Sequence, residues 1–106
     1  MAETKKIIDE LKNHLVKNYA GSVKEVILFG SRSYGSPEEF SDYDVLIILG
    51  NNYTSEDENQ ILDLCYDIDL KYNILLDVHI LSTKELNSPR GRQPVFVKAL
   101  KSGIRA

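Results

Sequence analysis

The 106-residue sequence has few of the features that mark membrane, secreted or zinc-binding proteins. Its longest unbroken apolar run, residues 45–49, is far shorter than the roughly 20 residues that span a bilayer. The N-terminal residues form no apolar signal segment. The single cysteine, Cys65, can form no internal disulfide and offers too few thiolates for a zinc site. We therefore expect a cytoplasmic protein that makes no membrane contact.

The sequence also lacks an excess of basic residues. It has 13 Lys and Arg against 16 Asp and Glu, a net charge of −3 and a pI near 5.3. General binding to a phosphate backbone is therefore not expected to be its main role, and nucleic acid is not an expected partner. Low-complexity stretches, long linkers and internal repeats are absent from the sequence as well. Its length predicts one domain over residues 1–106, built around one core.

Hydrophobic periodicity predicts that helices and strands alternate along the chain. Apolar residues at helical spacing predict helices over residues 4–19, 31–34, 55–72 and 94–104. Short apolar runs predict strands over residues 26–29, 44–49 and 75–81. Ser55 and Glu58 have the spacing of a capping box at the start of the second long helix. This order predicts a small α+β (α/β-type) domain with three strands flanked by helices, and leaves the strand order open.

A glycine–serine pair follows the first predicted strand directly. Gly30 lets the backbone approach a ligand closely, because no Cβ stands in the way. Free N–H groups at the start of the following turn favour an anion. Ser31 adds a hydroxyl donor and Arg32 a nearby cation. The segment therefore predicts a seat for a polyphosphate tail.

Three aspartates could form a metal site. Asp42 and Asp44 lie two residues apart at the start of the second strand, so their side chains would project to the same side. Asp77 is a lone charge in an otherwise apolar run, which is costly unless it is paired or binds metal. An isolated Asp-x-Asp pair is typical of a turn that enters a strand. Together with Asp77, it indicates a site for two divalent ions, Mg²⁺ or Mn²⁺, of the kind used in nucleotidyl transfer.

With these motifs, the segment from Gly30 to Asp44 resembles the signature of the polymerase-β-type nucleotidyltransferase superfamily, and most of all its minimal nucleotidyltransferases (MNT). The resemblance covers nearly the whole chain and implies a polymerase-β-like core with a small mixed three-stranded sheet. It implies that Asp42 and Asp44 coordinate both ions. Asp77 would bind the catalytic ion and help to activate the attacking hydroxyl, while Gly30 and Ser31 would hold the β- and γ-phosphates of ATP.

The resemblance also implies a partner. Many MNT proteins are antitoxins paired with HEPN-domain toxins, and they transfer AMP to a tyrosine of the toxin. We therefore expect an adenylyltransferase that acts on a HEPN toxin, in a homodimer or a hetero-oligomer. Two alternatives stay open: a protein that neutralises its partner by binding alone, and a catalytic core whose acceptor is a small molecule or RNA.

Several other residues admit two interpretations. His79 could touch the metal or substrate, or could be a partly buried packing residue. Arg90 and Arg92 could bind triphosphate or a partner, or could lie in a solvated loop. His14 and Cys65 border or lie on apolar helix faces, which favours structural roles for both.

Overall fold

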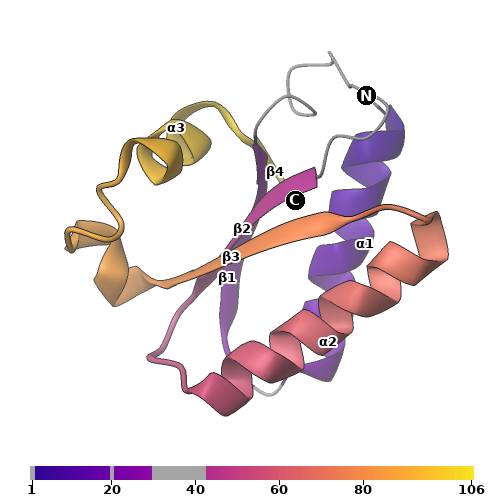
Figure 1. Ribbon diagram of the computed structural model, residues 1–106, viewed down its shortest axis with the longest axis horizontal. Coiled ribbons are helices and arrows are strands. Elements are labelled where there is room, and N and C mark those ends of the chain that lie inside the picture. Colours follow the sequence, from indigo (N-terminus) through magenta and orange to yellow (C-terminus); the bar gives the residue numbers. More distant parts are fainter. Residues whose placement is uncertain (1, 20, 30–42) are drawn as a thin grey trace.

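The computed structural model describes residues 2–19, 21–29 and 43–106 (Figure 1). Its helices are α1 (Ala2–Asn18), α2 (Ser55–Tyr72), the 3₁₀ helix η2 (Thr83–Asn87) and α3 (Pro94–Ser102). Its strands are β1 (Val23–Phe29), β2 (Tyr43–Leu49), β3 (Leu76–Ser82) and β4 (Ile104–Arg105). Among the described helices, none combines the length and the apolar character that crossing a bilayer requires.

The strands form one mixed sheet in the order β3-β2-β1-β4. Strand β1 pairs antiparallel with β2 and β4, whereas β2 and β3 run parallel. Parallel neighbours need a long crossover connection, which α2 supplies. The α+β class and the mixed sheet are thus confirmed, but the described residues contain four strands where the sequence predicted three.

The fourth strand corrects the predicted end of the last helix. We expected Ile104 on that helix, but α3 ends at Ser102 and Ile104 pairs with Leu28 of β1. The helix ends where the Gly103 N–H donates to the carbonyl of Ala99. A Cβ at Gly103 would lie 2.3 Å from Ile27 Cγ2, so only glycine allows the chain to approach β1 this closely.

Both faces of the sheet are covered, which explains the continuous apolar runs of β1 and β2. Helices α1 and α2 lie on one side of the sheet and α3 on the other (Figure 1). Because side chains alternate along a strand, each face has its own core. The core on the α1 and α2 side includes Val26, Leu28, Val45, Ile47 and Leu49. The core on the α3 side consists of Ile27, Phe29, Leu46, Ile48, Leu81, Phe96 and Ala99.

Polar contacts fix the ends and the pairing of the helices. The capping box of α2 uses Thr54 and Asp57, one residue before the predicted pair: Thr54 Oγ1 accepts from the Asp57 N–H at 3.2 Å, and the Asp57 carboxylate accepts from the Thr54 N–H at 2.9 Å. His14 on α1 pairs with Asp67 on α2 at 2.9 Å, and Cys65 is buried. These contacts support the structural interpretation of His14 and Cys65.

Candidate active site

The parallel pairing of β2 and β3 brings two of the predicted site residues together. Asp44 is the second residue of β2 and Asp77 the second residue of β3, and the two are register partners. Adjacent strands lie about 4.8 Å apart, and register partners project their side chains to the same side of the sheet. The structure therefore confirms that the second and third predicted strands are neighbours and that Asp77 meets Asp44.

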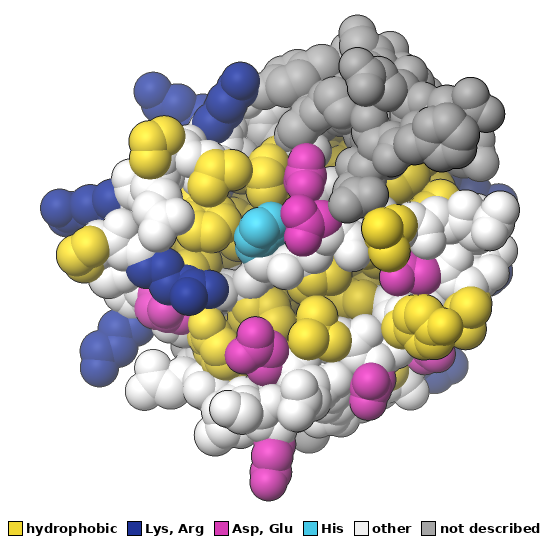
Figure 2. All heavy atoms as spheres, viewed as in Figure 1, with side chains coloured by type: hydrophobic (Ala, Val, Ile, Leu, Met, Phe, Trp, Pro, Cys, Tyr) yellow, Lys and Arg dark blue, Asp and Glu magenta, His cyan; other side chains and the backbone are white. Residues whose placement is uncertain are grey.

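A histidine completes this cluster. One ligand atom from each of Asp44, Asp77 and His79 lies within 4.8 Å of the others. His79 Nε2 is 3.6 Å from Asp77 Oδ2. Figure 2 shows a histidine beside acidic side chains at the molecular surface, next to apolar groups. His79 packs against Phe29 and Phe96 and also lies beside the two carboxylates, so the packing interpretation is confirmed and contact with metal or substrate stays a prediction.

The donor set suits a hard divalent cation. Two carboxylates this close repel each other, and a cation between them would remove that repulsion. Carboxylate oxygens are the ligands that Mg²⁺ and Mn²⁺ prefer. Opposite ligands of an octahedral ion with bonds of about 2.1 Å are about 4.2 Å apart. Small side-chain rotations would bring atoms now within 4.8 Å to that spacing, so Asp44 and Asp77 fit a bound ion.

The remaining predicted site residues, Gly30, Ser31, Arg32 and Asp42, lie outside the described residues. Their predicted roles therefore stay predictions. One described feature bears on them: Phe29, the last residue of β1, is the register partner of Asp44. Strand β1 therefore ends beside Asp44.

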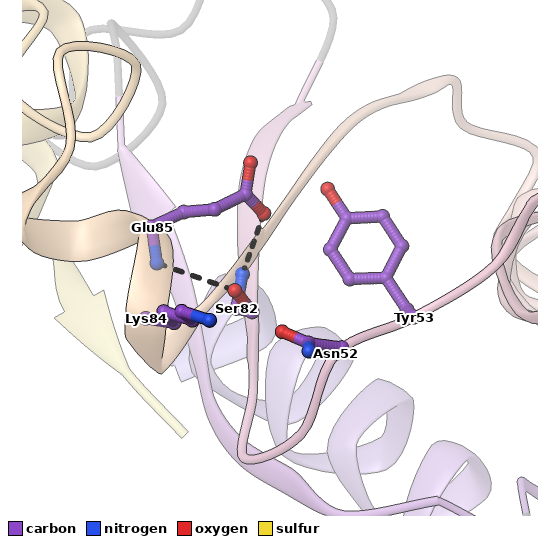
Figure 3. Close-up of a pocket in the computed structure, with 5 residues that line it drawn as sticks. All are labelled: Asn52, Tyr53, Ser82, Lys84 and Glu85. Atoms are coloured by element: carbon purple, nitrogen blue, oxygen red, sulfur yellow. Dashed lines mark hydrogen bonds between the residues drawn. The ribbon is translucent and has the colours of Figure 1, made fainter.

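A pocket of about 330 Å³ lies at the C-terminal ends of β2 and β3, away from Asp44 and Asp77 (Figure 3). Asn52, Tyr53, Ser82, Lys84 and Glu85 line it. The Tyr53 hydroxyl donates to the Ile80 carbonyl at 3.1 Å, and burial raises the pKa of Tyr53 above its ordinary value. Sequence reasoning missed this pocket and the 3₁₀ helix beside it. A signal was present, because Ser82 and Glu85 have the capping-box spacing and form that box.

Arg90 lies near this pocket. Its guanidinium donates to the Ile80 carbonyl at 3.2 Å and lies 3.5 Å from the Glu85 carboxylate. These contacts are toward the end of β3 that is remote from Asp77. They favour a structural role for Arg90, while Arg92 has an exposed side chain.

Comparisons with known proteins agree with this arrangement. The family described as "Polymerase beta, Nucleotidyltransferase" matches residues 5–95. A protein of Methanocaldococcus jannaschii named "Putative protein adenylyltransferase MJ0604" is 37% identical over 81 residues, which cover 76% of this chain and 75% of that protein. A second protein of that organism, "Putative protein adenylyltransferase MJ0141", is 36% identical over 70 residues, 66% of this chain and 71% of its own.

Two solved structures share the fold. A mutant of the toxin-antitoxin MntA-HpeT superposes with a TM-score of 0.65 at 15% identity, covering 92% of this chain and 69% of that chain. A toxin-antitoxin with AMP-PNP superposes with a TM-score of 0.60 at 17% identity, covering 95% of this chain and 70% of that chain. At this level of identity, the two likenesses establish a common fold.

Proposed function

The chain belongs to the polymerase beta nucleotidyltransferase family, and from this premise we propose that it transfers AMP from ATP to a hydroxyl group of a partner protein. The observation that carries the proposal is the side-by-side placement of Asp44 and Asp77 on parallel strands. A family match supports nucleotidyl transfer, and two carboxylates at one point provide ligands for the divalent ions that this chemistry uses. We infer AMP as the transferred group and a protein as the acceptor because the two relatives from Methanocaldococcus jannaschii are named as putative protein adenylyltransferases.

Two groups of residues in this chain would bind the metal ions and the phosphates of ATP. Asp44 and Asp77, together with the predicted Asp42, would hold Mg²⁺ or Mn²⁺. When bound, such ions neutralise the charge of the phosphates and make the acceptor hydroxyl more acidic. Gly30, Ser31 and Arg32 are proposed to bind the β- and γ-phosphates.

The acceptor oxygen would form a bond to the α-phosphorus while the bond from that phosphorus to the bridging oxygen breaks and pyrophosphate leaves. The acceptor hydroxyl loses its proton in this step, and we assign Asp77 to draw it away. Asp77 suits this task because its side chain is 52% exposed, so an acceptor can approach it. Holding the two reactants in line supplies much of the remaining acceleration.

We further propose that the protein is the antitoxin of a toxin–antitoxin pair, with a tyrosine of a HEPN-domain toxin as the acceptor. The support is the fold that it shares with toxin-antitoxin proteins, one of them with AMP-PNP. Residues 1–106 would act as one nucleotidyltransferase domain. The buried lone thiol of Cys65 suits the reducing cytoplasm, where we expect the protein to work.

An exposed apolar stripe on α2 supports contact with a partner. Leu62, Tyr66 and Leu70 are spaced four residues apart on one side of the helix and are 40%, 58% and 65% exposed. Apolar side chains gathered at a surface mark sites of protein interaction. Since the exposed Asp63 lies beside the stripe, the partner's matching surface should be apolar with a basic margin.

The direct test is transfer of label from ATP labelled at the α-phosphate. The reaction contains Mg²⁺, this protein and the product of the adjacent gene. Asp44→Asn and Asp77→Asn should each lower transfer on the order of 100-fold or more, because each removes a charged ligand. Glu56→Gln, an exposed carboxylate at the start of α2, is the matched control and should transfer at the wild-type rate. Equal labelling by the wild type and all three variants would contradict the proposal.

The same α2 stripe also favours the simpler alternative, in which the protein neutralises its partner by binding alone. Asp77→Asn separates the two functions. If the variant still forms the complex and still protects cells from the partner, binding suffices. If the complex forms and protection is lost, AMP transfer is required. A small-molecule or RNA acceptor would show as label outside the protein fraction.

A further inference from the structure

His79 lies beside the two carboxylates of the proposed metal site. It follows Asp77 by two residues on β3, so both side chains project to the same side of the sheet. Its ring nitrogen is within 4.8 Å of the ligand atoms of both Asp44 and Asp77. The sequence alone left open whether His79 packs or binds; the structure shows that it packs and places its ring nitrogen beside the two carboxylates.

Two phenylalanines hold the imidazole ring in place. Phe29 of β1 lies 5.8 Å from it, centroid to centroid, and Phe96 of α3 lies 5.7 Å away in an edge-on contact. Both phenylalanines are buried, at 7% and 5% exposed, so they restrict the rotation of His79. A ligand whose orientation is fixed by packing loses little entropy when it binds an ion.

The spacing between His79 and Asp77 fits shared coordination better than a direct hydrogen bond. The 3.6 Å between His79 Nε2 and Asp77 Oδ2 exceeds the roughly 2.7–3.2 Å of a hydrogen bond. Two ligands of one octahedral ion are about 3.0 Å apart when adjacent and about 4.2 Å apart when opposite. The observed separation lies between these values.

We propose that His79 donates a nitrogen ligand to the divalent ion that Asp44 and Asp77 hold, and that this nitrogen makes the site prefer Mn²⁺ to Mg²⁺. The inference rests on the proposed function for the presence of the ion. Mg²⁺ favours oxygen ligands and keeps several waters, whereas imidazole suits transition metals. Mn²⁺ accepts carboxylate ligands as Mg²⁺ does, and as a transition metal it also accepts an imidazole nitrogen.

Pulsed electron paramagnetic resonance of bound Mn²⁺ tests the ligand directly, because it detects a coordinated ¹⁴N nucleus. Protein grown with ¹⁵N-labelled histidine should lose the ¹⁴N modulation, and this comparison needs no substitution that could disturb folding. His14 is the one other histidine in the sequence, so His14→Gln should keep the signal and His79→Gln should lose it. Bound Mn²⁺ without histidine nitrogen coupling overturns the proposal and leaves the carboxylate site intact.

Titration of the two metals tests the preference. In His79→Gln, the Kd for Mn²⁺ should rise about tenfold or more, as ligand-shell substitutions commonly do. The Kd for Mg²⁺ should change by less than about threefold, because Mg²⁺ favours oxygen. An equal loss for both ions would mean a general disturbance and would overturn the preference. If the wild type binds neither ion, the proposed function fails together with this inference.

Discussion

Replacing Asp77 by asparagine should change stability in opposite directions with and without metal. The ligand oxygens of Asp44 and Asp77 are no more than 4.8 Å apart. At that distance two unit charges repel by about 0.9 kcal/mol in water and about 3.5 kcal/mol at an effective dielectric constant of about 20. Because the Asp77 side chain is 52% exposed, solvent screens it and the lower end applies. Asp77→Asn should therefore stabilise the metal-free protein by about 1 kcal/mol.

Bound metal should reverse this order. A ligand present at about 100 times its Kd stabilises the folded state by about 2.7 kcal/mol. If the substitution weakens binding about 100-fold, the variant keeps only about 0.4 kcal/mol of that gain. The wild type should then be the more stable protein by about 1 kcal/mol. The two free-energy differences have opposite signs, which makes the prediction independent of small errors in either value.

Urea unfolding in EDTA and in Mn²⁺ is the assay. With a typical dependence on urea, a change of 1 kcal/mol moves the midpoint by about 0.5 M. Asp63→Asn, an exposed aspartate on α2, is the control and should move the midpoint little in either buffer. A variant that is less stable than the wild type in EDTA and gains equally from Mn²⁺ would show that Asp77 is structural and holds no ion.

Three further predictions concern the fold. Hydrogen bonds from Lys71 and Tyr72 lower the pKa of Glu10 from its ordinary value of 4.5, so the stability that Glu10 contributes is present above pH 4.5 and is lost as the pH falls. In urea unfolding between pH 3 and 6, Glu10→Gln should reduce this loss of stability at low pH. An unchanged dependence of the unfolding free energy on pH would contradict the prediction. Gly103→Ala should cost about 1–3 kcal/mol, since its Cβ would meet two carbonyl oxygens within 3.0 Å; unchanged thermal unfolding would show that the chain shifts freely there. Thr54→Ala should cost about 1 kcal/mol and Ser55→Ala much less; the reverse order in urea would restore Ser55 as the cap.

The long elements could be predicted because their signals are local. Residues 4–19 and 55–72 carry helical periodicity, and α1 and α2 occupy nearly those ranges. The apolar runs predicted strands in the correct places, although β1 begins at Val23 rather than near residue 26. The prediction for Ile104 was wrong, because its apolar side chain suits both the apolar face of α3 and a strand. Its pairing with β1 makes it part of a strand.

The chemistry could be predicted from residue types and spacing. A carboxylate inside an apolar run, Asp77, was expected to be costly unless it is paired or binds metal. In the structure its side chain is half exposed, because it lies at the start of β3, so the expected burial cost was wrong although the position still adjoins Asp44. Its meeting with Asp44 was conditional on strands 44–49 and 75–81 being neighbours. The place of His79 could not be settled at all, because its contacts come from β1 and α3 as well as β3.

The faces of the helices and strands, the donor atoms available and the family resemblance thus follow from the amino-acid sequence alone, since each depends on residues near one another in the chain. Three-dimensional packing was needed to establish that β2 and β3 run parallel with Asp44 opposite Asp77, and that His79 packs against two phenylalanines beside these carboxylates. Strand order and register depend on how both faces of the sheet pack at once, so they cannot be predicted from the pattern of residues within one segment.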